Sequence, residues 1–319
     1  MTTDPPGWRH PPSSVRDFTS RSAGVTPGHI RERRDCLAST CGTRHPLGFV
    51  VTTTNGELDD PRSTGAAASG TSHNRSASHL LSVIVPVYNE RNTLPELLER
   101  VRAQSLSWNG LGVSLEIIVV DDCSNDGGVD FLIGEAGQST FSDVHVLRHA
   151  RNRGKGAAIR TGLERVTGDV VLIQDADLEY NPDDYAALIA PILAGQTRVV
   201  YGSRFLALGP LGRPTGMHPT NWVANKILSW TASILFLRSI TDEATCYKVF
   251  ATSVLPTLNL RCERFEFCPE VTSKILRRGL QVVEVPIRYH GRGGNEGKKI
   301  RWPDAFHAWF TLVRYWLRD

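Results

Sequence analysis

The chain has 319 residues and a formal net charge of +3 at pH 7, an excess too small to predict nucleic-acid binding. Its six cysteines form neither a C-x-x-C pair nor a set with the spacing of a zinc site, so we expect free thiols in a reducing compartment. From Leu80 onward the chain is long enough for one sizeable α/β domain with a single core.

The segment before Leu80 has a different composition. It is rich in Pro, Ser, Arg and Gly and shows little apolar periodicity, which is typical of disorder. It has no apolar run that would predict a secretory signal, and its acidic residues argue against an organelle transit peptide. We therefore predict a disordered leader over residues 1–79 and a folded domain over residues 80–319.

Two apolar segments near the start of the domain each end in polar residues. Residues 81–87 read LSVIVPV and precede Tyr88-Asn89-Glu90, and residues 115–120 read LEIIVV and precede Asp121-Asp122-Cys123-Ser124. Such runs predict buried parallel strands, whose carboxyl ends share one edge of a sheet. Pro86 could also mark an edge strand, where a missing N–H costs little.

A helix and a third strand are predicted next. The helix follows the first strand, because apolar residues recur at helical spacing from Leu94 to Val101. The third strand covers residues 144–147 and leads into the string NRGKG at 152–156. We interpret that string as mainly a tight turn that lets the following helix pack on the sheet.

The apolar run at residues 169–174 ends in Asp175-Ala176-Asp177. Two carboxylates one residue apart repel each other unless a cation lies between them, and Mg²⁺ or Mn²⁺ is the cation most often held by carboxylates together with substrate phosphates. Glu179 could join them directly or through water. A helix cap ahead of residues 182–188 is the alternative role. The pattern predicts a metal-bridged nucleotide.

These strings resemble, in their order and spacing, the inverting glycosyltransferases of the GT-A fold, and they are most similar to the polyprenol-phosphate branch, such as dolichol-phosphate mannose synthase. They read PVYNERNTLPELL, IIVVDDCSNDGG, NRGKGAAIRTGL and QDADLEYNPDDY, followed by YGSRF, TDEATCYKVF and EVPIRYHGRGGNEGKKI. The likeness covers residues 80–319. It implies an α/β fold with a Rossmann-like, mostly parallel sheet flanked by helices and with a C-terminal amphipathic helix.

The resemblance also implies which residues surround the nucleotide. Two positions depart from the usual pattern. Cys123 replaces a glycine, so we expect a turn without positive φ, and Glu179 replaces a glutamine, which adds a negative charge. The implied nucleotide-binding set is Pro86, Tyr88, Glu90, Val120, Asp122, Asp175 and Ala176, and the implied metal ligands are Asp175, Asp177 and Glu179.

Negative charge that develops on the leaving diphosphate must be neutralised, which we expect of the metal at Asp177 and of three cationic side chains. Arg204 follows a predicted strand and by resemblance contacts the acceptor phosphate or the donor sugar region. Arg292 and Lys298 lie in a glycine-bearing loop that is predicted to close over the diphosphate. A solvated basic loop is the alternative interpretation.

No residue clearly fits a catalytic base, and an acceptor that is already ionised, such as a polyprenyl phosphate, requires none. We predict a metal-dependent transferase that moves mannose or glucose from GDP-mannose or UDP-glucose to a polyprenyl (dolichyl) phosphate. A saccharide hydroxyl acceptor in cell-surface polysaccharide synthesis is the alternative, because Asp242 stands where related transferases have a base. A non-catalytic nucleotide-sugar-binding protein is a third interpretation, against which the paired acids argue.

Two segments bear on membrane association. Residues 221–237 are apolar but interrupted by Lys226, so we expect them at the interface or in the core. Residues 302–318 are predicted to form an amphipathic helix that suits the lipid headgroup zone or packs on the domain. Its expected apolar face consists of Phe306, Trp309, Phe310, Val313 and Trp316. We expect a cytoplasmic protein, peripherally associated with the membrane, that binds no nucleic acid.

Overall fold

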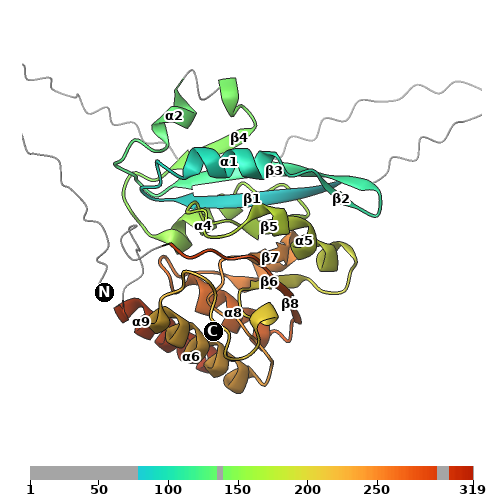
Figure 1. The fold of residues 1–319 in the computed structure, drawn as a ribbon, viewed down its shortest axis with the longest axis vertical. Helices are drawn as coiled ribbons and strands as arrows, with labels where there is room; N and C mark the ends of the chain where they lie inside the picture. Colours follow the sequence, from blue (N-terminus) through green and yellow to red (C-terminus); the bar gives the residue numbers. More distant parts are fainter. Residues whose placement is uncertain (1–77, 135–138, 293–301, 319) are drawn as a thin grey trace, which may run out of the picture. The chain divides into compact units, whose positions relative to one another are not determined.

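The computed structural model describes residues 78–134, 139–292 and 302–318 (Figure 1). Nearly all of the predicted leader, and the part of the predicted basic loop that contains Lys298, lie outside these residues. The described chain forms a sheet of eight strands flanked by helices, so the predicted fold class is confirmed.

The sheet is parallel where the nucleotide site is predicted. Strand β1 (His79–Val87) lies between β3 (Leu111–Asp121) and β5 (Val170–Ile173), and β4 (Val144–Arg148) pairs with the end of β3, all four in parallel. Their carboxyl ends therefore meet at one edge. The short β2 (Leu106–Trp108) pairs antiparallel with the start of β3.

The other half of the sheet contains the antiparallel pairings. Strand β7 (Lys248–Ala251) runs antiparallel to both β5 and β6 (Val199–Ser203), and β6 pairs in parallel with β8 (Val282–Pro286). The sheet thus continues from β5 through β7 and β6 to β8, and it carries the residues that follow β6 and β8 toward the same site.

Eight helices are described. Helices α1 and α4 lie on opposite sides of the sheet around β1 and β3, whereas α6, α8 and α9 pack against one another beyond β6 and β8 (Figure 1). The helices are α1 (Leu94–Arg102), α2 (Asp130–Ile133), α4 (Lys155–Leu163), α5 (Tyr185–Leu193), α6 (Pro219–Phe236), α7 (Leu255–Leu258), α8 (Phe267–Arg277) and α9 (Trp302–Leu317), with short 3₁₀ turns at Pro182–Asp184, Leu206–Leu208 and Thr252–Val254.

The central strands β1, β5, β6 and β7 are largely buried on both faces, as the apolar runs predicted. Along β3, Ile118 and Val120 pack with Ala158 of α4, while Ile117 and Val119 join the main core on the other face. Helix α4 approaches the sheet closely at Gly162, because this residue has no side chain. A Cβ at this position would lie only 2.6 Å from a side-chain carbon of Ile84. Gly162 therefore allows α4 to pack close to β1.

Strand β1 is central, so the interpretation of Pro86 as the mark of an edge strand is wrong for the strand as a whole. The pairing of β1 with β5 ends at Ile84, and only β3 accompanies β1 beyond that point. Pro86 lies opposite Val120 of β3 in this stretch. A proline is tolerated there because one side of the strand needs no ladder hydrogen bond.

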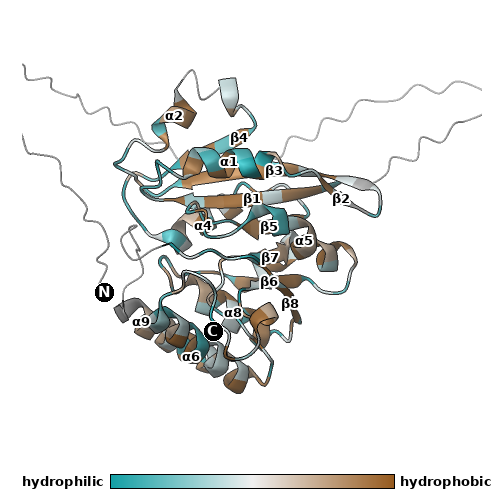
Figure 2. Cartoon of the chain, in the orientation of Figure 1, coloured by the Kyte–Doolittle hydropathy of each residue, from teal (hydrophilic) through white to brown (hydrophobic). Residues whose placement is uncertain are grey.

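Helices α6 and α9 carry many apolar residues (Figure 2). Some of these side chains are buried and others are exposed. Helix α9 buries Ala308, Leu312 and Tyr315, so its packing face differs from the aromatic face that the sequence suggested, most of which stays exposed. Among the described residues, none of the helices combines the length and the apolar content that crossing a lipid bilayer requires.

Candidate active site

The loops after β1 and β3 hold each other at the carboxyl edge of the sheet. The backbone N–H of Asn89 donates to the Ser124 hydroxyl at 2.9 Å, and the N–H of Asn125 donates to the Asn89 side-chain oxygen at 2.9 Å. The first two predicted motifs therefore form one rigid rim, and Tyr88 stands partly exposed on it.

The turn after β3 corrects one expectation. Cys123 has a φ of 64°, so it adopts the left-handed conformation that a glycine would favour. The buried Asp121 carboxylate imposes this geometry by accepting the Ser124 N–H at 2.9 Å. The left-handed conformation of a non-glycine residue costs roughly 1–2 kcal/mol, and the hydrogen bonds of the turn offset this cost.

Asp122 faces inward from this turn. Its carboxylate contacts His149 Nδ1 at 2.7 Å and accepts the N–H groups of Arg153 at 2.8 Å and Gly154 at 2.6 Å. Asp122 thus anchors the NRGKG turn, where Gly154 has a φ of 100° at the start of α4. Its predicted contact with the nucleoside stays a prediction, and its oxygens are already engaged by the protein.

Lys155 is a site residue that the sequence analysis missed. The turn directs its ammonium to Asp175, with Nζ 2.5 Å from Oδ1. Burial disfavours the charge, but the Asp175 carboxylate outweighs it and raises the pKa of Lys155 well above its usual value. The available signal was a lysine between two glycines at a helix start beside the sheet edge.

The D-A-D string places two acids at the end of β5, with Ala176 buried between them. Burial and the negative charges of Asp175 and Glu179 raise the pKa of Asp177 to about 7, although Arg292 acts in the opposite direction. Near neutral pH, the Asp177 carboxyl is therefore only partly ionised when no cation is bound. A cation bound at Asp177 would relieve this repulsion.

Glu179 has other partners than a metal. Its carboxylate accepts the Tyr289 hydroxyl at 2.7 Å and the backbone N–H of Arg292 at 2.9 Å. Within the described ranges, no group of three or more His, Cys, Asp or Glu side chains is placed to hold a metal ion. Glu179 thus fixes the segment after β8, and the predicted metal set of Asp175, Asp177 and Glu179 stays a prediction.

Arg292 joins the last predicted motif to the first. Its guanidinium donates from Nη2 to Glu90 at 2.7 Å and from Nε to the Asp177 carbonyl at 2.9 Å. Thr93 also donates its hydroxyl to Glu90, at 2.9 Å. Three predicted site residues from distant parts of the chain therefore converge, whereas Lys298 lies outside the described residues.

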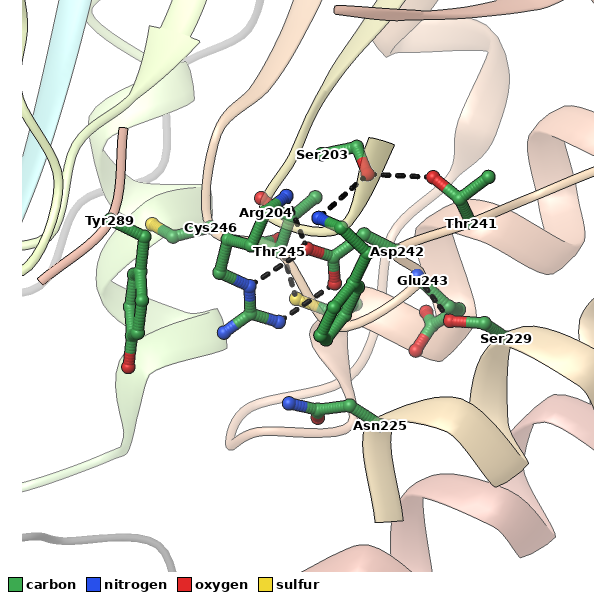
Figure 3. Close-up of polar contacts among 12 residues, drawn as sticks. Ser203, Arg204, Asn225, Ser229, Thr241, Asp242, Glu243, Thr245, Cys246 and Tyr289 are labelled. Atoms are coloured by element: carbon green, nitrogen blue, oxygen red, sulfur yellow. Dashed lines mark hydrogen bonds and ion pairs between the residues drawn. The ribbon is translucent and has the colours of Figure 1, made fainter. Parts of the chain in front are cut away.

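Arg204 lies near Tyr289 and is neutralised by Asp242 (Figure 3). Its Nε and Nη2 each donate to the Asp242 carboxylate at 2.7 Å, and its backbone N–H donates to the same carboxylate at 2.9 Å. Burial works against the Arg204 charge, but Asp242 outweighs burial and raises the pKa of the guanidinium still further. Asp242 is completely buried, so it is poorly placed to take a proton from a hydroxyl acceptor.

Aromatic rings connect Arg204 to the acidic residues. The guanidinium carbon lies 5.2 Å from the centre of the Tyr289 ring and 6.0 Å from that of Tyr180. Tyr289 in turn donates its hydroxyl to Glu179. The Val120 side chain packs with Ile118 and Ala158 under α4, and its predicted place beside the nucleoside stays a prediction.

The comparisons with known proteins agree with this arrangement. Residues 82–251 match the sequence profile of Glycosyl transferase family 2. Undecaprenyl-phosphate 4-deoxy-4-formamido-L-arabinose transferase of Salmonella dublin is 29% identical over 219 residues, which are 68% of this chain and 62% of that protein. This chain thus spans less than two thirds of the length of that relative.

Solved structures share the fold. Glucosyl-3-phosphoglycerate synthase from Mycobacterium tuberculosis in complex with UDP superimposes with a TM-score of 0.54 at 19% identity, covering 76% of this chain and 82% of that one. Mannosyl-3-phosphoglycerate synthase from Rubrobacter xylanophilus gives a TM-score of 0.55 at 18% identity, covering 75% and 73%. Because the matched profile extends over more than half of the sequence and the acidic, cationic and glycine-bearing strings fall at the sheet edge, this chain belongs to Glycosyl transferase family 2.

Proposed function

We propose that this glycosyltransferase moves a hexose, mannose or glucose, from a nucleoside diphosphate to a polyprenyl phosphate with inversion at the anomeric carbon. The observation that carries the proposal is the convergence of Asp175, Asp177, Lys155 and Arg292 at the carboxyl edge of the sheet. Paired acids beside two cations suit a diphosphate that is bridged by a metal. The named activity of the undecaprenyl-phosphate relatives supports the acceptor class.

A divalent cation, Mg²⁺ or Mn²⁺, fits the acidic pair. Burial and the neighbouring carboxylates raise the pKa of Asp177 to about 7, so the nearby Arg292 does not fully offset the repulsion among the acids. Asp177 and Asp175 would hold the cation together with phosphate oxygens. When bound, the cation would supply positive charge where the leaving diphosphate becomes more negative. The Mycobacterium tuberculosis synthase has been crystallised with Mn²⁺ and UDP-glucose, which supports the proposal.

Other residues of this chain would bind the nucleoside and the phosphates. Tyr88 and Glu90 stand at the rim where a nucleoside would bind, and Arg292 would transfer from Glu90 to the phosphates. Lys155 would shift from Asp175 toward the diphosphate as the cation takes its place. A lipid phosphate oxygen is already ionised at neutral pH, so the acceptor needs no base. The engagement of Asp242 by Arg204 favours this acceptor over a saccharide hydroxyl.

A membrane surface is the partner we propose for the apolar sides of α6 and α9. Val223, Ile227, Trp230 and Ile234 recur at helical spacing along α6, and all four are exposed. Trp309 of α9 donates its indole N–H to Thr231 at 3.2 Å, so the exposed aromatic residues of α9 continue this surface. A lipid-linked acceptor would be presented at such an interface.

The test is transfer by the purified protein from radiolabelled nucleotide sugars to polyprenyl phosphate, with Mg²⁺, with Mn²⁺ and with excess chelator. We expect metal-dependent formation of an acid-labile glycosyl lipid from either GDP-mannose or UDP-glucose. A parallel reaction with oligosaccharide acceptors examines the alternative. Transfer only to hydroxyl acceptors would overturn the proposed acceptor, and undiminished transfer in excess chelator would remove the metal.

A further inference from the structure

Lys226 is a buried cation in the middle of α6. Its exposed fraction is 7%, and its ammonium lies 4.0 Å from the centre of the Phe205 ring. Among the described residues it makes no hydrogen bond and no ion pair. Burial lowers the pKa of Lys226, against the attraction of the Asp242 and Glu284 carboxylates.

Two other buried lysines, Lys248 and Lys274, differ from Lys226 because each ammonium has an oxygen partner. The ammonium of Lys248 donates to the Glu243 carbonyl at 2.6 Å, and that of Lys274 pairs with the Glu270 carboxylate at 2.8 Å. Burying an ammonium without an oxygen partner is unfavourable, and a methionine or leucine would pack against Phe205 at lower cost. The cation–π contact with Phe205 offsets part of this cost, but Lys226 has no oxygen partner among the described residues, so the stability of the fold does not by itself account for a lysine here.

The position of Lys226 suggests a different role. Phe205 directly follows Arg204, whose guanidinium carbon lies 5.6 Å from the centre of the same ring. Arg204 uses Nε and Nη2 to bind Asp242, so within the described chain its Nη1 has no hydrogen-bond partner. Asp242 neutralises Arg204, and the Glu284 carboxylate accepts the N–H groups of Thr241 and Asp242. Lys226 thus contributes a cation that no carboxylate contacts directly.

We propose that Lys226, together with Nη1 of Arg204, binds the phosphate of the acceptor. This inference rests on the proposed function, because it requires an acceptor with a phosphate group. The geometry of α6 suits an amphiphilic acceptor, because the helix buries Lys226 against Phe205, the ring that Arg204 also approaches, and exposes Ile227 and Trp230. A phosphate monoester could come from a polyprenyl lipid or from a soluble phosphorylated acid, and the experiment separates the two.

The experiment compares Lys226→Met, Lys226→Arg and wild type, with Lys248→Met as the matched control. Lys248 is also buried with its ammonium over an aromatic ring, 3.8 Å from the centre of Tyr201, but it has an oxygen partner. For each protein we would measure KM for polyprenyl phosphate in detergent, KM for 3-phosphoglycerate, KM for the nucleotide sugar, kcat and Tm.

For Lys226→Met we expect the KM of the phosphate acceptor to rise roughly 10- to 100-fold, the scale of a lost charged hydrogen bond. The donor KM should be unchanged and Tm equal to or above that of wild type, because an unpartnered buried charge is removed. Lys226→Arg should recover much of the acceptor affinity. Lys248→Met should lower Tm without a selective effect on acceptor KM.

The outcomes also separate this inference from the proposed function. If wild type transfers to polyprenyl phosphate but Lys226→Met keeps its acceptor KM, the role of Lys226 is disproved and the function stands. A lower Tm with an unselective loss of activity would likewise assign Lys226 to the fold. If 3-phosphoglycerate alone is used and its KM responds to Lys226→Met, the phosphate site stands and the lipid acceptor does not. If wild type uses neither phosphate acceptor, both fail.

Discussion

At the scale of single residues, Asp177 carries a conflict between stability and function. Its pKa is about 7 in the folded protein against a usual 3.8, chiefly because of burial and then because of Asp175 and Glu179. Between about pH 4 and pH 7 the native state therefore binds a proton that the unfolded chain has released. The free energy of unfolding of the metal-free protein consequently falls as the pH rises through this window.

Asp177→Asn tests the effect of this carboxylate on both thermal stability and transfer. At pH 8 the metal-free variant should melt above wild type, because a repelled charge has been removed. At pH 5, where Asp177 is mostly protonated, the two should melt alike. Transfer should fall about 10²-fold or more in kcat/KM, the scale of one lost preorganised electrostatic element. Thermal scans at both pH values and a transfer assay make the measurement.

Asp183→Asn is the matched control for this change. Asp183 lies a few residues further along and is more than half exposed in its ion pair with Arg288, so its replacement should leave both quantities nearly unchanged. A variant of Asp177 that melts below wild type at pH 8 would contradict the assignment of repulsion at this site.

Asp242 stabilises the fold, whereas the charge of Asp177 destabilises it. The Asp242 carboxylate neutralises the buried Arg204 guanidinium. In Asp242→Asn, Arg204 would keep its charge without a carboxylate, so we expect the free energy of unfolding to fall by about 3 kcal/mol or more. Chemical denaturation gives this value directly. The control is Asp143→Asn, which removes an exposed partner of Arg102 and should cost no more than about 1 kcal/mol. Equal losses in the two variants would show that the Arg204 pair is not energetically distinct.

At the scale of elements, the sequence predicted the strands and their ends well. Apolar runs that are buried on both faces leave little choice of structure, and the polar strings after β1, β3 and β5 do lie at one edge. The partners of individual side chains were much less predictable. Glu179 meets Tyr289, which is 110 positions away in the sequence, and nothing local to either residue indicates that pairing. The φ of Cys123 was missed because tertiary hydrogen bonds override its local preference.

The segment after β8 provides the next prediction. Arg292 donates to the Glu90 carboxylate, so a nucleotide that bound to either side chain would compete with this contact. In Arg292→Ala, Glu90 loses this competing partner. We therefore expect binding of the free nucleoside diphosphate to weaken little, while transfer falls strongly because a cation near the phosphates is lost. Calorimetric titration beside a transfer assay would separate the two effects.

Arg288→Ala is the control for Arg292→Ala. Arg288 lies in the same segment but binds the carboxylates of Asp183 and Asp184, so its loss should affect stability more than transfer. Undiminished transfer in Arg292→Ala would contradict a catalytic role and would leave this residue as a structural link between the two motifs.

At the scale of the whole molecule, the described domain has one surface that its own packing does not explain. Trp230 is 59% exposed and Ile234 71% exposed on α6, and Phe310 is 56% exposed on α9. Exposed basic residues, among them Arg238, Arg314 and Arg318, accompany these apolar side chains. Apolar side chains with basic residues nearby favour a membrane interface that contains anionic lipids.

The last prediction follows from this surface. Trp230→Glu and Phe310→Glu each remove a large side chain from the lipid and add a charge, and fully burying such a side chain is worth about 1.5–3 kcal/mol. Each variant should therefore bind anionic vesicles at least about tenfold more weakly, as measured by sedimentation. Ile133→Glu on α2 is the control, because Ile133 is similarly exposed at 44% but lies on a helix away from α6 and α9 (Figure 1). Transfer should fall with polyprenyl phosphate in vesicles and stay near wild type with a short-chain acceptor dissolved in detergent, since the chemical site is intact. Equal losses with both acceptors would mean that these residues support the fold of the active site and do not dock it to the membrane.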